Sequence, residues 1–120
     1  MEVTILNRTP GRGEALACRF GCRAAPLASF REIAPGLVVN ATPVGMLPDR
    51  SSLLSGGDLE PGMTVFDLVY NPPETPLLDL ARRAGCRVIP GTEMFIHQAR
   101  EQFFHVTGIR VPEAVVRELV

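Results

Sequence analysis

The stretch that decides the fold is residues 64–89, which read TVFDLVYNPPETPLLDLARRAGCRVI. It opens and closes with short apolar runs rich in β-branched residues, the pattern of buried strands. Between these runs, Thr75 is placed to cap a helix that begins at Pro76, a favoured first helical position, and Gly85 follows the helix end. Strand, helix and strand in this order predict the parallel unit of an α/β protein.

The same alternation extends outward on both sides of this stretch. Further apolar strands are expected at residues 3–6 and 37–40, and further helices at residues 12–20, 26–33, 92–107 and 112–120. Buried parallel strands need helices on both faces of their sheet. We therefore expect a Rossmann-like doubly wound parallel sheet, truncated at its N-terminal side.

Composition excludes several classes of function. The 120 residues carry a formal net charge of −1, so no basic excess exists to neutralise nucleic acid. No apolar run reaches the ~18 residues of a membrane span, and the N-terminus lacks the layout of a signal peptide. The three cysteines form no Cys-x-x-Cys pair. They indicate free thiols in a reducing cytoplasm rather than a disulfide frame or a metal site.

A pair of arginines follows the first expected strand. Residues 7–9 read Asn-Arg-Thr, Arg12 lies four residues beyond Arg8, and no carboxylate stands at this strand end. In dinucleotide-binding folds an acidic residue at this place binds the ribose 2′-hydroxyl of NAD, whereas arginine accommodates the 2′-phosphate of NADP. Two guanidinium groups suit one phosphate by charge and geometry. Solvated arginines at a helix start would give the same pattern.

Polar residues also end the second and third strands, and ligands in open α/β sheets bind beyond such ends. Asn40 and Thr42 are placed to contact a ligand, although an ordinary turn has the same composition. Tyr70 can point its hydroxyl into the same crevice. For Asp67 we expect a structural role, because a carboxylate inside an apolar strand needs hydrogen-bond donors such as the backbone N–H groups of the following loop.

The segment after the last strand opens the longest helix. Met94 and Gln98 lie one turn apart on one helix face, so Gln98 can hydrogen-bond a hydroxylated substrate, or it is simply exposed. Neither His97 nor His105 has a cysteine or carboxylate at a convincing metal-ligand spacing. We therefore predict no metal site.

Taken together, these segments resemble the shikimate dehydrogenase family. Four matches follow the order of the family and cover nearly the whole chain: Asn7-Arg8-Thr9-x-x-Arg12, Asn40-Ala41-Thr42-Pro43-x-Gly45-Met46, Asp67-Leu68-Val69-Tyr70-Asn71-Pro72 and Gly91-x-x-Met94-x-x-x-Gln98-Ala99. Each match is weak alone, but four in order are specific.

The resemblance implies NADP as cofactor and a reversible hydride transfer between NADPH and 3-dehydroshikimate that gives shikimate, a step of aromatic amino acid biosynthesis. It places the NADP 2′-phosphate on Asn7, Arg8, Thr9 and Arg12. It places nicotinamide-side contacts on Thr42, Leu68, Gly91 and Met94, and it puts Tyr70 and Gln98 on the shikimate side.

The departures from the family pattern matter as well. The family's glycine-rich pyrophosphate loop precedes the Asn-Arg-Thr strand, and its catalytic lysine and aspartate lie in a preceding substrate domain. This sequence begins at that strand and contains no lysine. We therefore expect residues 1–120 to form a partial NADP-binding domain without a substrate domain or a catalytic residue, inactive by itself. The strand missing from mid-sheet favours self-association through the open sheet.

Two other interpretations stay open. One is a stand-alone nucleotide-binding or interaction module without turnover. The other is the cofactor domain of a glutamyl-tRNA reductase-like enzyme, which also carries an Asn-Arg-Thr segment. The segments that begin at Asp67 and Gly91 argue against the latter. The sequence does not separate shikimate from quinate, and it leaves open a fusion to another enzyme of the pathway.

Overall fold

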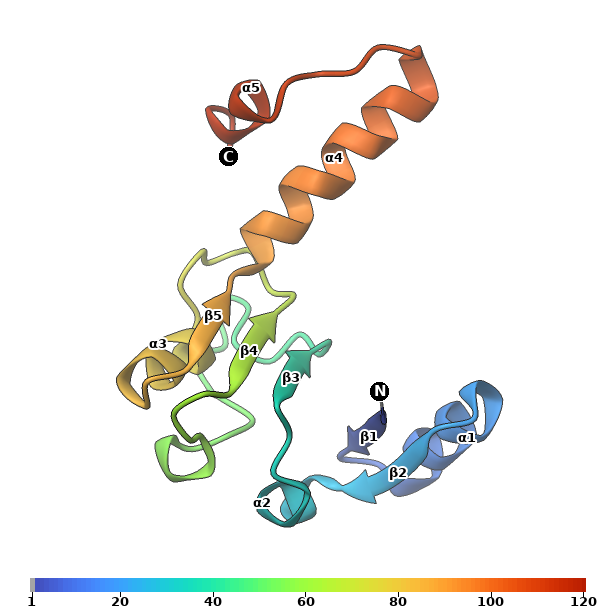
Figure 1. Ribbon diagram of the computed structural model, residues 1–120, viewed down its shortest axis with the longest axis vertical. Helices are drawn as coiled ribbons and strands as arrows, with labels where there is room; N and C mark the ends of the chain where they lie inside the picture. The colour runs from blue at the N-terminus through green and yellow to red at the C-terminus, as the bar shows by residue number, and fades with distance from the viewer. Residues whose placement is uncertain (1) are drawn as a thin grey trace. The chain divides into compact units, whose positions relative to one another are not determined.

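The computed structural model describes residues 2–120 and divides the chain into two compact units, the first ending at Pro35 and the second spanning Gly36–Val120. Each unit is an α/β arrangement of parallel strands and helices (Figure 1).

The first unit is a strand-helix-strand unit whose two strands are parallel. Its elements are β1 (Thr4–Asn7), α1 (Pro10–Phe20), β2 (Arg23–Pro26), the 3-10 turn η1 (Leu27–Ser29) and α2 (Phe30–Ile33). Thr4 of β1 lies opposite Arg23 of β2. The helix between them ends at Gly21, whose φ of 64° is the left-handed conformation that glycine adopts without strain.

The strand β2 corrects the expectation from sequence, which placed no strand there. Its Arg-Ala-Ala-Pro composition is poor in β-branched residues, and it is mostly exposed. It is a strand because β1 pairs with it along four residues. The helix expected over residues 26–33 is correspondingly shorter, since Pro26 is extended and the α-helical part begins at Phe30.

The second unit is built on a three-stranded parallel sheet in the order β3-β4-β5. Its elements are β3 (Leu37–Asn40), the 3-10 turn η2 (Gly56–Asp58), β4 (Thr64–Asp67), α3 (Pro76–Arg83), β5 (Arg87–Ile89), α4 (Gly91–Thr107) and α5 (Glu113–Arg117). The expected cap is confirmed, because the Thr75 hydroxyl accepts a hydrogen bond from the N–H of Leu78. Gly108 ends α4 with a φ of 72°.

The core of the second unit lies between α3 and the sheet. Burial alternates along β4, so Val65 and Asp67 are buried while Phe66 is only half-buried. Leu78 and Ala81 of α3 have no solvent exposure, like Val65. One face of the sheet therefore carries the packed core, and the other face is only partly covered.

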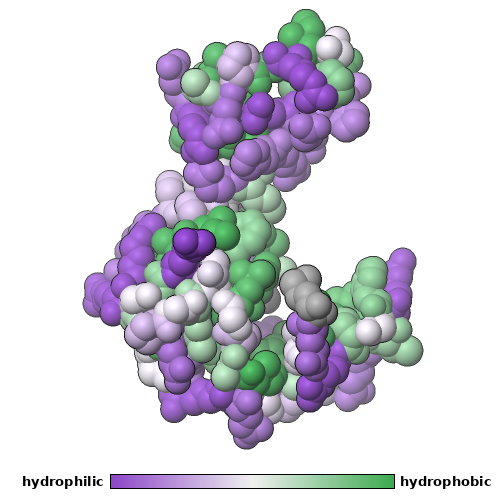
Figure 2. All heavy atoms as spheres, viewed as in Figure 1, coloured by the Kyte–Doolittle hydropathy of each residue, from purple (hydrophilic) through white to green (hydrophobic). Residues whose placement is uncertain are grey.

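Apolar side chains stay accessible on that other face. Leu37 and Val39 of β3 are 50% and 48% exposed, and register places Val39 beside Phe66 and Ile89 on the same face. Figure 2 shows apolar surface, in green, left uncovered on the second unit.

The strand pairings follow a Rossmann order. In a doubly wound sheet of order 3-2-1-4-5-6, the pair β1-β2 corresponds to strands 2 and 3, and the run β3-β4-β5 corresponds to strands 4, 5 and 6. Within residues 2–120, no further strand pairs with β1 or β3 at the edge where strand 1 of that order would lie. The expected fold class is confirmed.

Candidate functional site

The turn between β1 and α1 presents the two arginines predicted to bind phosphate. The backbone N–H of Thr9 donates to the side-chain oxygen of Asn7 at 2.9 Å, and the Thr9 carbonyl accepts from the N–H groups of Arg12 and Gly13. Asn7 therefore shapes the turn, while Arg8 and Arg12 are exposed. Neither arginine forms an ion pair within residues 2–120, and the first turn of α1 holds no acidic residue.

A buried polar cluster joins the carboxyl ends of β3 and β4 to the start of α3. Asp67 has no solvent exposure. Its Oδ1 accepts from the side-chain amide of Asn40 at 3.0 Å and from the N–H of Val69 at 3.1 Å. Its Oδ2 accepts from the Thr75 hydroxyl at 2.6 Å. The expectation that Asp67 would hold the following loop by a backbone N–H is confirmed.

Asn40 also forms hydrogen bonds with the turn that follows β3. Its side-chain oxygen accepts from the N–H of Thr42 at 3.0 Å and from the Thr42 hydroxyl at 2.8 Å, and its amide nitrogen also donates to the Val44 carbonyl at 3.3 Å. The Thr42 side chain is thereby held at the end of β3, in an exposed position.

Gly91 lies against the backbone that follows β4. A Cβ built on Gly91 would be 2.4 Å from the Val69 carbonyl oxygen and 2.8 Å from that of Leu68. Only a residue without a side chain permits this approach. Two of the predicted nicotinamide-side residues, Leu68 and Gly91, are therefore in direct backbone contact. The N–H of Leu68 also donates to the Asn40 carbonyl at 3.0 Å, which ties the same segment to β3.

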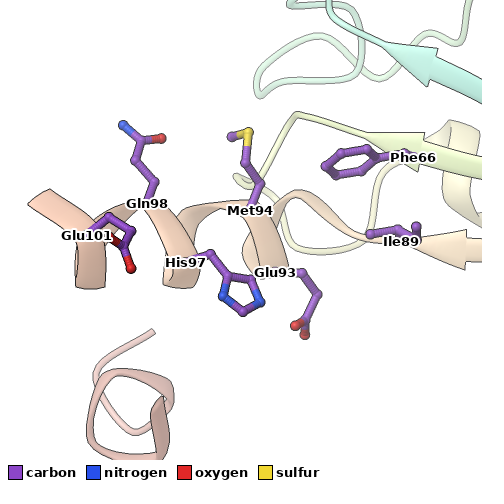
Figure 3. Close-up of a pocket in the computed structure, with 7 residues that line it drawn as sticks. All are labelled: Phe66, Ile89, Glu93, Met94, His97, Gln98 and Glu101. Carbon is purple, nitrogen blue, oxygen red and sulfur yellow. The ribbon is translucent and has the colours of Figure 1, made fainter. Parts of the chain in front are cut away.

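The first turns of α4 carry Met94 and Gln98, and these turns contact Tyr70 in the segment after β4. The ring of Tyr70 stacks on Phe95 with centroids 4.9 Å apart, and Tyr70 remains 48% exposed. Met94 and Gln98 project from one side of α4, and both line a pocket of about 560 Å³ (Figure 3). Its remaining lining residues are Phe66, Ile89, Glu93, His97 and Glu101.

At the pocket rim, Glu93 forms an ion pair with Arg117 of α5. Arg117 donates to both carboxylate oxygens of Glu93, at 2.8 and 2.6 Å, and this contact holds the pKa of Glu93 below its ordinary value. Contact with Glu93 and Glu113 raises the pKa of Arg117. The ion pairs fasten α5 to the start of α4, so they fix one rim of the pocket.

The predicted site residues fall into two groups, one in each unit of the chain. Thr42, Leu68, Tyr70, Gly91 and Met94 follow the carboxyl ends of β3, β4 and β5 in the second unit, and Gln98 lies one helical turn beyond Met94. Asn7, Arg8, Thr9 and Arg12 follow the carboxyl end of β1 in the first unit.

Two residues of the site, Phe95 and Thr75, were not among the predicted contacts, whereas Asn40 was a candidate for ligand contact. Phe95 supports the Tyr70 ring, and no spacing rule pairs a strand-end residue with a helix residue so far along the chain. Asn40 and Thr75 complete the partners of Asp67. A polar residue at each of two adjacent strand ends was the available signal for the pair of Asn40 and Asp67.

Two further classes of site are not found. No group of three or more His, Cys, Asp or Glu side chains in the described part of the chain is arranged to hold a metal ion. Among residues 2–120, no helix combines the length and apolar character needed to cross a membrane.

Parallel strands with polar groups gathered at their carboxyl ends define the class: the chain carries much of a dinucleotide-binding α/β domain. Residues 91–120 match the family described as Shikimate 5'-dehydrogenase C-terminal domain. The chain is 38% identical over 99% of its length to a shikimate dehydrogenase (NADP(+)) of Maridesulfovibrio salexigens, and 41% identical over 97% to one of Archaeoglobus fulgidus. Over nearly its whole length the chain is therefore similar to shikimate dehydrogenases. It spans 44% and 46% of these two relatives, slightly under half of their length.

Solved structures give the same picture for the fold. A shikimate 5-dehydrogenase of Thermus thermophilus in complex with NADP(H) and shikimate superposes with a TM-score of 0.87 at 37% identity, over 98% of this chain and 44% of that one. A quinate dehydrogenase of Corynebacterium glutamicum in complex with NAD superposes with a TM-score of 0.85 at 31% identity, over 98% of this chain and 45% of that one.

Proposed function

We propose that this chain forms part of the cofactor-binding domain of an NADP-dependent shikimate dehydrogenase. That enzyme transfers a hydride reversibly between NADPH and 3-dehydroshikimate, giving shikimate in aromatic amino acid biosynthesis. The observation that carries the cofactor assignment is the turn after β1, where Arg8 and Arg12 are exposed without an acidic partner in the described residues. Two unpaired guanidinium groups fit a phosphate monoester by charge and geometry, and no carboxylate in the first turn of α1 repels it.

The proposed roles divide the site residues into three groups. Asn7, Arg8, Thr9 and Arg12 bind the 2′-phosphate side of NADP, with Asn7 shaping the turn. Thr42, Leu68, Gly91 and Met94 lie on the nicotinamide side. Tyr70 and Gln98 contact the hydroxylated substrate. The nicotinamide supplies or accepts the hydride when bound, and these residues orient it and exclude water.

Residues 1–120 are proposed to be one part of a longer NADP-binding domain, located in the cytoplasm, that does not turn over substrate alone. The chain contains no lysine, and the proposed site residues include no histidine, aspartate or glutamate to handle the proton that accompanies the hydride. Positioned proton transfer contributes about 10²–10⁴-fold to such rates. The relatives favour this proposal over a stand-alone module or a glutamyl-tRNA reductase-like enzyme.

The test is the cofactor preference of the complete natural polypeptide. Losing one charge-assisted phosphate contact costs about 1.5–3 kcal/mol, which is roughly a 10- to 150-fold weaker interaction. Arg8→Ala should raise KM for NADP by about that factor and leave KM for NAD nearly unchanged. Arg19→Ala, in the last turn of α1, the helix that follows Arg8, is the matched control and should change neither. Equal loss for both cofactors in Arg8→Ala would remove the basis of the assignment.

Quinate is the second candidate substrate, because the similar quinate dehydrogenase of Corynebacterium glutamicum shares the fold of this chain. Steady-state rates with shikimate and quinate, each with NADP and with NAD, separate the two. The proposal expects shikimate with NADP to give the highest kcat/KM.

A further inference from the structure

The backbone fixes which way the buried Asn40 amide faces. The Val44 carbonyl can only accept, and it lies 3.3 Å from the amide nitrogen of Asn40. The N–H of Thr42 can only donate, and it lies 3.0 Å from the side-chain oxygen. Asp67 adds a third constraint, because its carboxylate oxygen Oδ1 can only accept, and it therefore faces the amide nitrogen of Asn40. The side-chain oxygen of Asn40 must therefore face Thr42.

This orientation commits the hydroxyl proton of Thr42. The hydroxyl oxygen lies 2.8 Å from the side-chain oxygen of Asn40, which has no proton to give. Thr42 must therefore donate to Asn40. The chain of bonds runs from Thr42 to Asn40 and from Asn40 to the buried carboxylate of Asp67.

The remaining capacity of the Thr42 oxygen is a single lone pair. A hydroxyl oxygen has two acceptor positions, and one already accepts from the N–H of Val44 at 3.2 Å. Thr42 is exposed, so the other position is accessible to a ligand. That position accepts an N–H or O–H group and repels a carbonyl or phosphate oxygen.

We propose that Thr42 accepts a hydrogen bond from the carboxamide N–H of the nicotinamide, and that Asn40 and Asp67 are positioning residues that hold Thr42 in this acceptor state. The proposal rests on the proposed function, which puts Thr42 on the nicotinamide side of NADP. The carboxamide carries both a donor and an acceptor and can rotate. A fixed acceptor on the protein therefore selects the rotamer that presents the NH₂ group, and this orients the ring.

The experiment measures dissociation constants of the complete natural polypeptide by isothermal titration calorimetry, so it does not depend on turnover. The probes are NADP and its 3-acetylpyridine analogue, in which a methyl group replaces the carboxamide NH₂. The wild-type protein should bind NADP more tightly by about 2- to 10-fold, the range of one neutral hydrogen bond. Thr42→Val, which removes the hydroxyl at nearly constant volume, should abolish this preference, and Thr42→Ser should restore it.

The roles of Asn40 and Asp67 are tested by the same ratio of dissociation constants, that of the 3-acetylpyridine analogue to NADP. Asp67→Asn keeps an oxygen for Asn40 and Val69, so it should retain the preference for NADP. Asn40→Ala releases the Thr42 hydroxyl to rotate and donate, so it should lose the preference. Should Asn40→Ala not fold, as judged by circular dichroism, the exposed Thr42 variants still decide the matter.

Three results would overturn the inference. If Thr42→Val weakens the binding of both probes equally, the group that donates to Thr42 is one that both probes share, such as a ribose hydroxyl, and not the carboxamide. A variant that binds both like the wild type would remove Thr42 from the cofactor site. Full preference in Asn40→Ala would show that Asn40 and Asp67 do not set the state of Thr42. All three leave the proposed function standing if Arg8→Ala still weakens NADP selectively, whereas a wild-type protein that binds neither probe would contradict the proposed function itself.

Discussion

Replacing Gly91 with alanine should destabilise the protein even though alanine is the better helix former. The new Cβ would lie 2.4 Å from the Val69 carbonyl oxygen, where ordinary contact begins at 3.4 Å, so the start of α4 must move away by about 1 Å. Backbone lies on both sides of the contact, so no side chain can rotate to relieve it. Overpacking of this kind costs about 1–3 kcal/mol, and the gain in helix propensity offsets about 1 kcal/mol. We expect a net loss of up to about 2 kcal/mol.

The matched control is Gly11→Ala, in the first turn of α1. A Cβ there meets no atom within 4 Å, so only the propensity gain remains, and the protein should be unchanged or more stable by up to about 1 kcal/mol. Urea unfolding of the complete polypeptide without cofactor, followed by circular dichroism, gives both free energies of unfolding. If Gly91→Ala stabilises the protein as much as Gly11→Ala does, the close approach of α4 to the segment after β4 is wrong.

The remaining predictions concern the buried cluster, the helix pair and assembly. Thr75→Val removes both the cap of α3 and a donor to Asp67, so it should lower the free energy of unfolding by about 2–4 kcal/mol, while Thr75→Ser should retain most of the stability; equal losses would contradict the assigned bonds. Because Arg117 lowers the folded-state pKa of Glu93, the pair contributes stability that is present above the ordinary glutamate pKa and lost as pH falls through the lowered one. A carboxyl NMR titration should therefore place Glu93 below its ordinary pKa, and Arg117→Gln should restore it; an unshifted Glu93 in the wild-type protein would refute the contact. Residues 1–120 expressed alone should self-associate at micromolar concentration, because the edges of β1 and β3 are unpaired in the described residues; a monomer in sedimentation with cooperative unfolding would count against this.

Much of the fold followed from local pattern. The strands at residues 37–40 and 64–67 each contain a short apolar run, and the structure confirms them, as it does the helix that Thr75 caps. The strand Arg23–Pro26 escaped prediction because pairing with β1, not composition, makes it extended. The helix expected over residues 92–107 begins one residue earlier, at Gly91, after an extended Pro90. Nothing local signals that helix start, because it depends on the contact with the segment after β4.

The site shows the same division between local and tertiary information. The structural role of Asp67 followed from a carboxylate placed inside an apolar strand, and the bond from Val69 confirms it. Its bond to Asn40 joins residues 27 positions apart, and only the register of β3 with β4 brings them together. The stacking of Tyr70 on Phe95 likewise depends on how α4 leaves the sheet. Sequence therefore indicated which strand ends carry polar groups, and the tertiary structure supplied their partners.

The most direct test of the central claim is the steady-state oxidation of shikimate by the complete natural polypeptide that contains this chain, with NADP and with NAD as alternative cofactors. The account predicts shikimate-dependent formation of NADPH, with a higher kcat/KM for NADP than for NAD and a preference that Arg8→Ala largely removes. A polypeptide that folds and binds NADP but leaves shikimate unoxidised, or one that prefers NAD, would contradict it.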